Sequence, residues 1–162
     1  MCFDIKRIFE QTKMNPTGVY FIGSCGGEIC TAKDETAIFS SKLPPDVINI
    51  TIDYCEKNGL NLEFYCEAKY VACTRENEMH IHHCNSTRLS SKVLTYSEMR
   101  EYCMKHPPSK FLVTEDPAII AKKFHHSFLH SPHRFSIEYF PNYLPSSLLH
   151  VVPSAQTHTF VR

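Results

Sequence analysis

The sequence predicts an α/β fold in which short strands alternate with amphipathic helices. Apolar runs such as Val19–Ile22 are typical of buried strands. Between such runs lie segments with apolar residues at helical spacing and recognisable ends, such as Thr95–His106. The chain has 162 residues, of which 43% are hydrophobic, so it has the length and the apolar content of one domain with a buried core.

The first part of the chain favours a helix followed by three strands. Apolar residues at helical spacing predict a helix over Phe3–Met14, which the turn-forming Asn15–Gly18 ends. Val19–Ile22 is the first strand. Glu28–Thr31 and Thr36–Ser40 are short strands joined by a polar turn, and they predict a hairpin.

A second helix begins at Pro44-Pro45, because proline is tolerated in the first helical turn, and Gly59 ends it. Its expected buried stripe consists of Val47, Ile50 and Tyr54, with Ile48 and Thr51 as further members.

The middle of the chain continues the alternation. Leu60–Tyr65 and Tyr70–Thr74 are rich in aromatic and branched residues and predict strands. The segment Arg75–Leu94 is polar and poorly periodic, and we predict only that it contains a helix. Thr95-Tyr96-Ser97-Glu98 matches a capping box and begins a helix that runs to about His106.

The last third ends in a segment without regular pattern. Lys110–Thr114 predicts a strand, Asp116-Pro117 caps a helix that runs to about Leu129, and Phe135–Phe140 predicts another strand. Residues 141–162 carry prolines, serines and histidines with no clear period, so we expect a loosely ordered tail.

Charge and cysteine usage restrict the partners and the compartment. Lys plus Arg and Asp plus Glu number 17 each, so no strong field gathers nucleic acid or acidic membranes. The N-terminus has no apolar signal core, and no segment is apolar enough to span a membrane. The cysteines stand singly, which predicts reduced thiols and a cytoplasmic location. They are Cys2, Cys25, Cys30, Cys55, Cys66, Cys73, Cys84 and Cys103.

Several short motifs, in order and spacing, resemble the Cof-type branch of the haloacid dehalogenase-like (HAD) hydrolases. Tyr20–Ile29 (YFIGSCGGEI), Leu43-Pro44-Pro45 and Asn58-Gly59-Leu60 carry the first half of the resemblance. Lys110–Pro117 and Phe135–Pro141 resemble the later cap segments of that branch.

The resemblance implies an α/β cap domain with only a fragment of the Rossmann-like core. Residues 1–27 would be a partial core helix, strand and hinge, residues 28–140 the cap, and residues 141–162 the tail. It also implies Mg²⁺ as the family's metal and a phosphorylated small molecule as the ligand that the cap covers. The oligomeric state is left open.

The catalytic groups that the resemblance implies are an Asp-x-Asp nucleophile motif, a lysine and a magnesium-binding acidic pair. No two of the five aspartates stand two positions apart, and Asn142–Ser147 has no lysine where one is expected. Glu115-Asp116 is better explained as a helix start, and Asp34 as part of a polar turn. We therefore expect a catalytically incomplete chain that binds no Mg²⁺ by itself, and its status as an enzyme stays open. The aspartates are Asp4, Asp34, Asp46, Asp53 and Asp116.

The hinge and substrate-binding candidates are Ser24, Cys25, Gly26 and Gly27. The glycine pair permits backbone rotation, and it lacks the spacing of a dinucleotide or Walker phosphate loop. The family's Asn-Gly-Ala is replaced by Cys25-Gly26-Gly27, so a contact made by that asparagine is not carried over.

Histidine clusters raise the alternative of a metal site. If His80–Cys84 is extended, His80 and His82 share one face and, with Cys84, could bind Zn²⁺ or Cu, although a polar edge is the simpler interpretation. His126 and His130, in a cluster with His125 and His133, share a helix face that more simply faces solvent.

Three functions remain from the sequence. The leading one is a truncated or catalytically incomplete relative of Mg²⁺-dependent phosphatases of sugar phosphates and small metabolites. The alternatives are a non-catalytic binding or regulatory module for a phosphorylated metabolite or a protein, and a His/Cys metal-binding protein. A Ser–His or Cys–His nucleophile pair has no signature in the sequence, since such partners meet only in space.

Overall fold

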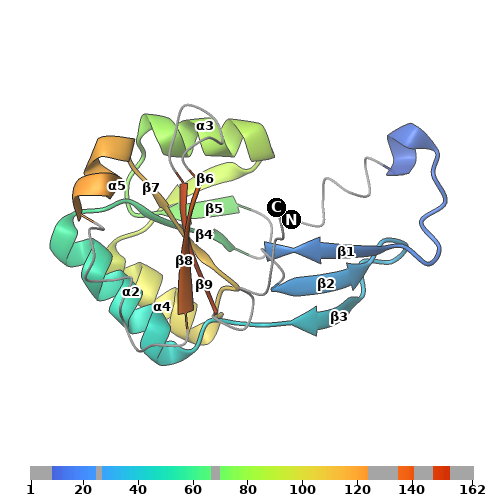
Figure 1. Cartoon of the computed structure of the whole chain (residues 1–162), viewed down its shortest axis with the longest axis horizontal. Coiled ribbons are helices and arrows are strands. Elements are labelled where there is room, and N and C mark those ends of the chain that lie inside the picture. Colours follow the sequence, from blue (N-terminus) through green and yellow to red (C-terminus); the bar gives the residue numbers. More distant parts are fainter. Residues whose placement is uncertain (1–8, 25–26, 67–69, 124–134, 141–147, 154–162) are drawn as a thin grey trace.

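The computed structural model describes residues 9–24, 27–66, 70–123, 135–140 and 148–153, and it contains two sheets with helices (Figure 1). The smaller sheet has the order β1-β2-β3 and is antiparallel. Its strands are β1 (Tyr20–Gly23), β2 (Glu28–Thr31) and β3 (Ala37–Ser40). The mixed α/β class predicted from the sequence is confirmed.

The larger sheet has six strands in the order β6-β5-β4-β7-β9-β8. These are β4 (Leu62–Cys66), β5 (Tyr70–Cys73), β6 (Ser90–Val93), β7 (Phe111–Thr114), β8 (Phe135–Phe140) and β9 (Leu148–Pro153). The helices are α2 (Pro45–Asn58), α3 (Glu78–Thr87), α4 (Tyr96–Lys105) and α5 (Pro117–Lys123). β5 and β6 pair in parallel with α3 between them in sequence, and the other pairs are antiparallel.

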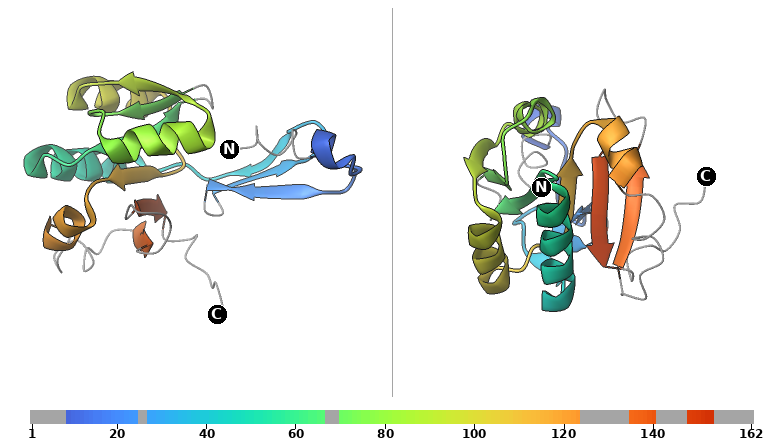
Figure 2. Two further views of the ribbon diagram at one scale, coloured as in Figure 1. Left: turned by 90° about the horizontal axis from the view of Figure 1, so that it is seen from above. Right: turned by 90° about the vertical axis from the view of Figure 1, so that its left-hand side faces the viewer.

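The two sheets lie end to end, with the three-stranded sheet extending away from the helix-covered one (Figure 2). α2 and α4 pack together on one face of the larger sheet, where they bury an apolar core. Because side chains alternate along a strand, Phe64 of β4 points into this core while Glu63 and Tyr65 point to the opposite face, toward α3.

Helix ends follow the sequence signals. The left-handed Gly59 (φ 60°) terminates α2, and its N–H reaches the Glu56 carbonyl. The Thr95–Glu98 capping box opens α4 as predicted. The buried face of α2 differs in part from the predicted stripe. Val47, Ile48 and Thr51 are buried with Ile52 and Cys55, whereas Ile50 and Tyr54 are only partly buried.

One prediction of local structure is confirmed only in part, and another is wrong. The Arg75–Leu94 segment is a helix only over Glu78–Thr87, where Asn77 caps α3, and its end forms strand β6. β6 is an exposed edge strand without apolar alternation, so the sequence carried no strand signal there. Residues 148–153 of the expected loose tail form β9, which pairs with both β7 and β8.

Other predictions lie wholly or partly beyond the described residues. Of the helix predicted over Phe3–Met14, residues 9–14 are described, and residues 9–12 are helical. The predicted continuation of α5 to Leu129 lies outside the described residues. None of the described helices is long and apolar enough to cross a membrane. The six described cysteines are free and buried, as expected for reduced thiols.

Candidate functional site

A pocket of about 400 Å³ lies where the chain passes between the two sheets. Residues 41–44, which connect β3 to α2, and residues 106–110, which connect α4 to β7, both contribute to it. The Leu43 N–H donates to the Pro108 carbonyl at 2.8 Å and links these two connections. The lining residues are Ser24, Glu28, Lys42, Tyr65, Tyr102, His106, Pro107, Pro108, Ser109 and Lys110.

One wall of this hinge pocket is a polar triangle. The Lys42 ammonium donates to the Glu28 carboxylate and to the Ser109 hydroxyl, both at 3.0 Å, and Ser109 donates to Glu28 at 2.9 Å. Burial by itself would raise the pKa of Glu28, but these hydrogen bonds outweigh it and hold the pKa below its ordinary value. The wall therefore presents an ion pair at neutral pH.

The pocket lining also combines a second cation with aromatic rings. Lys110 is only 6% exposed, and its ammonium lies 5.9 Å from the centroid of the Tyr65 ring. The Tyr102 ring packs near His106, with centroids 4.9 Å apart. Two lysines, one carboxylate and two serine hydroxyls give the pocket a net positive, hydrogen-bonding lining that suits an anionic ligand.

Of the predicted hinge residues, Ser24 lines this pocket. Ser24 lines it in a left-handed conformation (φ 51°) and donates from its hydroxyl to Glu28 at 3.2 Å. The Gly27 N–H closes a turn on the Ser24 carbonyl at 3.1 Å. Cys25 and Gly26 lie outside the described residues, so rotation at this hinge stays a prediction.

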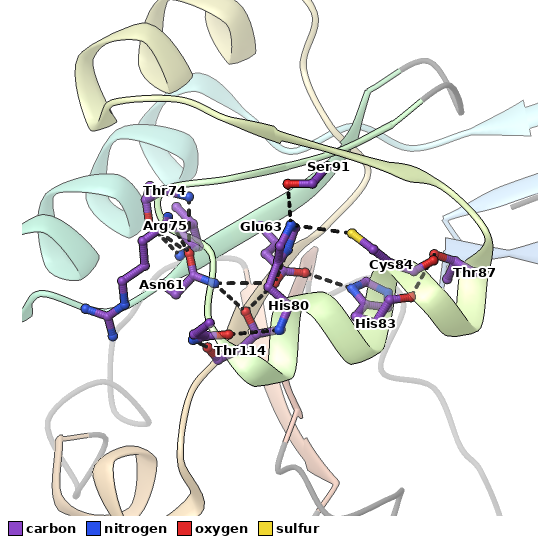
Figure 3. A network of polar contacts seen from close by, with 12 residues as sticks. Asn61, Glu63, Thr74, Arg75, His80, His83, Cys84, Thr87, Ser91 and Thr114 are labelled. Carbon is purple, nitrogen blue, oxygen red and sulfur yellow. Dashed lines mark hydrogen bonds and ion pairs between the residues drawn. The ribbon is translucent and has the colours of Figure 1, made fainter.

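A second polar site lies under α3, on the other face of the larger sheet (Figure 3). Glu63 is fully buried and accepts from two histidines of α3: His80 Nδ1 at 2.8 Å and His83 Nδ1 at 2.7 Å. Burial by itself would raise the pKa of Glu63, but its hydrogen bonds with the two histidines lower it. Burial would lower the pKa of His80, yet contacts with Cys73 and Glu63 raise it to about 10. At neutral pH the core of this network is an imidazolium paired with a carboxylate.

The network continues across the ends of the central strands β4 and β7 and fixes Glu63. Asn61 donates from Nδ2 to the Thr114 hydroxyl at 2.8 Å, and Thr114 donates to Glu63. Buried Glu115 accepts from the Asn61 N–H at 2.6 Å and from Arg75. Every polar group in this chain of contacts has a partner, which is the condition under which buried charges are tolerated.

The network reaches the hinge pocket through one side chain. The Tyr65 hydroxyl lies 2.7 Å from His83 Nε2, and its ring lines the pocket. Hydrogen bonds therefore connect Tyr65 of the hinge pocket, through His83, to the buried carboxylate of Glu63.

The structure contradicts the extended geometry assumed for His80, His82 and Cys84. These residues lie on helix α3, where Asn77 accepts the His80 N–H at 2.8 Å as the N-cap. His80 and Cys84 share the buried face at i and i+4, and His82 points to solvent. The three therefore do not converge on a metal.

The part of the chain that the structure describes gathers no three His, Cys, Asp or Glu side chains suited to a metal ion. The described residues do not fit the Mg²⁺ that the family implies, so we derive no step through it. Asp34 sits in the exposed turn after β2, and Asp116 caps α5 by accepting the Ala118 N–H at 2.7 Å, both as predicted. His125, His126, His130 and His133 fall outside the described residues.

Sequence reasoning named Ser24 and His80 but missed most of the residues that make both sites. Asn61 and Glu63 stand at alternate positions in an otherwise apolar strand, and that period-2 pattern was the signal for a polar sheet face. The pocket residues Lys42, Ser109 and Lys110 come from two connections 67 positions apart, and no local pattern links them.

Comparisons with known proteins agree with this fold. A family model described as haloacid dehalogenase-like hydrolase matches residues 1–144. A comparison with curated protein sequences gives no significant match.

Three similar solved structures illustrate the likeness. A haloacid dehalogenase-like hydrolase from Bacteroides thetaiotaomicron aligns with 93% of this chain and 54% of its own at 16% identity, TM-score 0.71. A sugar phosphatase of HAD subclass IIB aligns over 91% and 50% at 12% identity, TM-score 0.61. A haloacid dehalogenase-like hydrolase from B. subtilis aligns over 94% and 58% at 7% identity, TM-score 0.63.

The chain thus spans about half the length of these structures, and at such identities the likeness concerns the fold. Together with the family match over most of the chain, it shows that this protein belongs to the haloacid dehalogenase-like hydrolase family.

Proposed function

We propose that this chain is the ligand-covering part of a phosphatase for sugar phosphates and similar phosphorylated metabolites. Residues 28–140 would form the cap, and residues 1–27 a core fragment with its hinge. The observation that carries the proposal is the hinge pocket, which Lys42 and Lys110 both line. Family membership and the sugar phosphatase among the similar structures support it.

The pocket chemistry matches the two halves of such a ligand. A phosphate group accepts charge-assisted hydrogen bonds from ammonium and hydroxyl donors, which Lys110, Lys42 and Ser24 can supply. The rings of Tyr65 and Tyr102, with Pro107 and Pro108, provide apolar surface for the carbon skeleton.

The smaller sheet has an exposed apolar face, to which β1 of the proposed core fragment and β2 and β3 of the proposed cap all contribute. Tyr20 and Ile22 of β1 are 60% and 73% exposed, and Phe39 of β3 is 47% exposed. The register pairs Ile22 with Ile29 and Ile29 with Phe39, so these side chains share one sheet face. An apolar face of this kind is typical of a surface that another part of a core covers.

We further propose that the chain is catalytically incomplete by itself, because its sequence has no Asp-x-Asp motif. Magnesium would then bind to groups outside the described residues, and the location would be the cytoplasm. Magnesium-dependent phosphatase activity of the purified 162-residue protein, abolished by chelation, would overturn this part of the proposal.

Isothermal titration calorimetry with sugar phosphates and the matching unphosphorylated sugars tests the binding function. We expect heat only with the phosphorylated compounds, and Lys110→Met should weaken binding about 10- to 100-fold, the value of one lost hydrogen bond to a charged group. Lys105→Met is the matched control, because Lys105 is exposed and pairs with Glu101 on α4. Equal binding of sugars with and without phosphate would refute the proposal.

A non-catalytic binding or regulatory module is the second candidate, favoured by the same missing motif. It predicts phosphosugar or protein binding without turnover under any metal condition, including in a longer form of the protein. Turnover by such a longer form would exclude it.

A further inference from the structure

Three side chains from three different elements line up under α3 (Figure 3). The Ser91 hydroxyl of β6 lies 2.8 Å from His80 Nε2, and His80 Nδ1 lies 2.8 Å from Glu63 Oε1. A hydroxyl, an imidazole and a carboxylate in this order are the arrangement that activates a serine nucleophile.

The carboxylate decides which tautomer the imidazole adopts. A carboxylate only accepts hydrogen bonds, so Nδ1 of His80 carries a proton and donates it in the hydrogen bond to Glu63. In the neutral ring the lone pair then sits on Nε2 and faces the Ser91 hydroxyl. Glu63 is itself fixed by Thr114 and His83, so the ring has one orientation.

The three side chains differ in their exposure to solvent. His80 and Glu63 are fully buried, whereas Ser91 is exposed on the edge strand. Cys84 also approaches His80 Nε2, at 3.4 Å, but burial raises the pKa of its thiol to about 11 and keeps it protonated. Ser91 is therefore the accessible nucleophile of the pair.

We propose that Ser91 is a nucleophilic serine, with His80 as its base, which accepts acyl groups from aryl esters and mixed anhydrides. Glu63 is the positioning residue that orients His80. This site shares none of the residues that line the hinge pocket, and the proposal is independent of the phosphatase function.

The chemical step follows from the geometry. The Ser91 O–H bond breaks and its proton moves to His80 Nε2, while the Oγ forms a bond to the acyl carbon. The bond from that carbon to the leaving oxygen breaks, and its electron pair departs with the leaving group as an anion. Because His80 is fully buried, it cannot reach out to protonate a poor leaving group, which restricts the substrate to esters and anhydrides with acidic leaving groups.

The surroundings of His80 set the pH at which the step occurs. The groups that contact it are Glu63 on β4, Cys73 on β5, Cys84 on its own helix and Ser91 on β6, and His83 lies against the same Glu63 carboxylate. Contacts with Cys73 and Glu63 raise the pKa of His80 to about 10, so the neutral base is scarce at pH 7. The acylation rate should rise about tenfold per pH unit from pH 7 to pH 9.

The test is labelling of the purified protein with a fluorophosphonate probe and with p-nitrophenyl acetate at pH 9, with the modified residue mapped by mass spectrometry. We expect one equivalent on Ser91, and a loss of at least about 100-fold in the labelling rate in Ser91→Ala, the lower range for base-assisted attack. Ser90→Ala is the matched control, because Ser90 is the exposed neighbour on the same strand, and it should label at the wild-type rate.

The role of Glu63 has its own readout. Glu63→Gln should move the rate–pH profile to lower pH, because His80 loses the carboxylate that raises its pKa. A merely structural Glu63 would lower the folded fraction without moving the profile. No adduct at pH 9, an adduct on Cys84, or an equal rate in Ser91→Ala would overturn the proposal.

Discussion

Replacement of Glu63 by glutamine should cost this protein a large part of its folding stability. Glu63 and His80 are both fully buried, so Glu63→Gln leaves a buried imidazole without its counter-charge. Breaking one side of a buried ion pair typically costs about 3–5 kcal/mol. The substitution keeps the side-chain volume, so packing changes little.

The raised pKa of His80 gives a second estimate of the loss in unfolding free energy. A shift from 6.5 to about 10 in the folded state amounts to about 5 kcal/mol at roughly 1.4 kcal/mol per unit. About 4 kcal/mol of this is present at pH 7, where the unfolded histidine is already partly deprotonated. Cys73 also raises the pKa of His80, so Glu63→Gln removes only part of this contribution and should lower the free energy of unfolding by about 3 kcal/mol at pH 7.

The sign of the pH dependence follows from the same shift. A raised folded-state pKa stabilises fully below about pH 6.5, and the contribution is lost as the pH rises through about 10. The lowered pKa of Glu63 acts in the opposite direction, since its contribution is lost as the pH falls below the ordinary value of 4.5. With respect to these two groups, the wild type should be most stable between the ordinary pKa values of Glu63, 4.5, and of His80, 6.5.

Urea unfolding followed by circular dichroism at several pH values measures these effects. His82→Gln is the matched control, because His82 is exposed on the same helix, and it should stay within about 0.5 kcal/mol of wild type. A loss below about 1 kcal/mol in Glu63→Gln, or a wild-type stability that does not fall between pH 8 and pH 10, would refute the buried ion pair.

Three further substitutions test the fold. Phe64→Ala should lower the free energy of unfolding by about 3–5 kcal/mol, because Phe64 is 1% exposed and packs against Phe111 and Tyr102; a loss under 1 kcal/mol in urea unfolding would contradict the assigned core. Thr95→Ala should cost about 1 kcal/mol through loss of the capping box, whereas Ser97→Ala, in the exposed first turn of α4, should not. Gly59→Ala should cost about 1 kcal/mol by thermal melting because the C-cap needs a positive φ, and an unchanged melting temperature would argue against that conformation.

The hinge pocket and the network under α3 lie on opposite sides of one residue. Tyr65 contributes its ring to the pocket and its hydroxyl to His83. A ligand that moves the Tyr65 ring must also disturb the hydrogen bond to His83. The aromatic contact between Tyr65 and His83, with centroids 5.6 Å apart, holds the two together in the present arrangement.

The sequence by itself determined the order of most elements. The ends of α2 and α4 could be predicted because proline, glycine and the Thr95–Glu98 box act through neighbouring backbone groups. The strands β1 and β7 were predicted as Val19–Ile22 and Lys110–Thr114. β7 is buried throughout, whereas β1 is exposed or only partly buried, because an apolar run does not say which surface will cover it. The resemblance to HAD-like hydrolases rested on the spacing of these elements.

Only the tertiary structure decided the two sites and two of the strands. β6 and β9 owe their conformation to pairing with β5 and with β7 and β8, and a strand that depends on its neighbours leaves little pattern of its own. The extended geometry assumed for His80–Cys84 was wrong because the segment is helical, and its weak periodicity did not show which face of α3 would be buried. Glu63, His80 and Ser91 are 17 and 11 positions apart, and Lys42 is 67 positions from Ser109. Such side chains meet through long-range packing, which sets their distances and their charges, and periodicity along the chain cannot encode either.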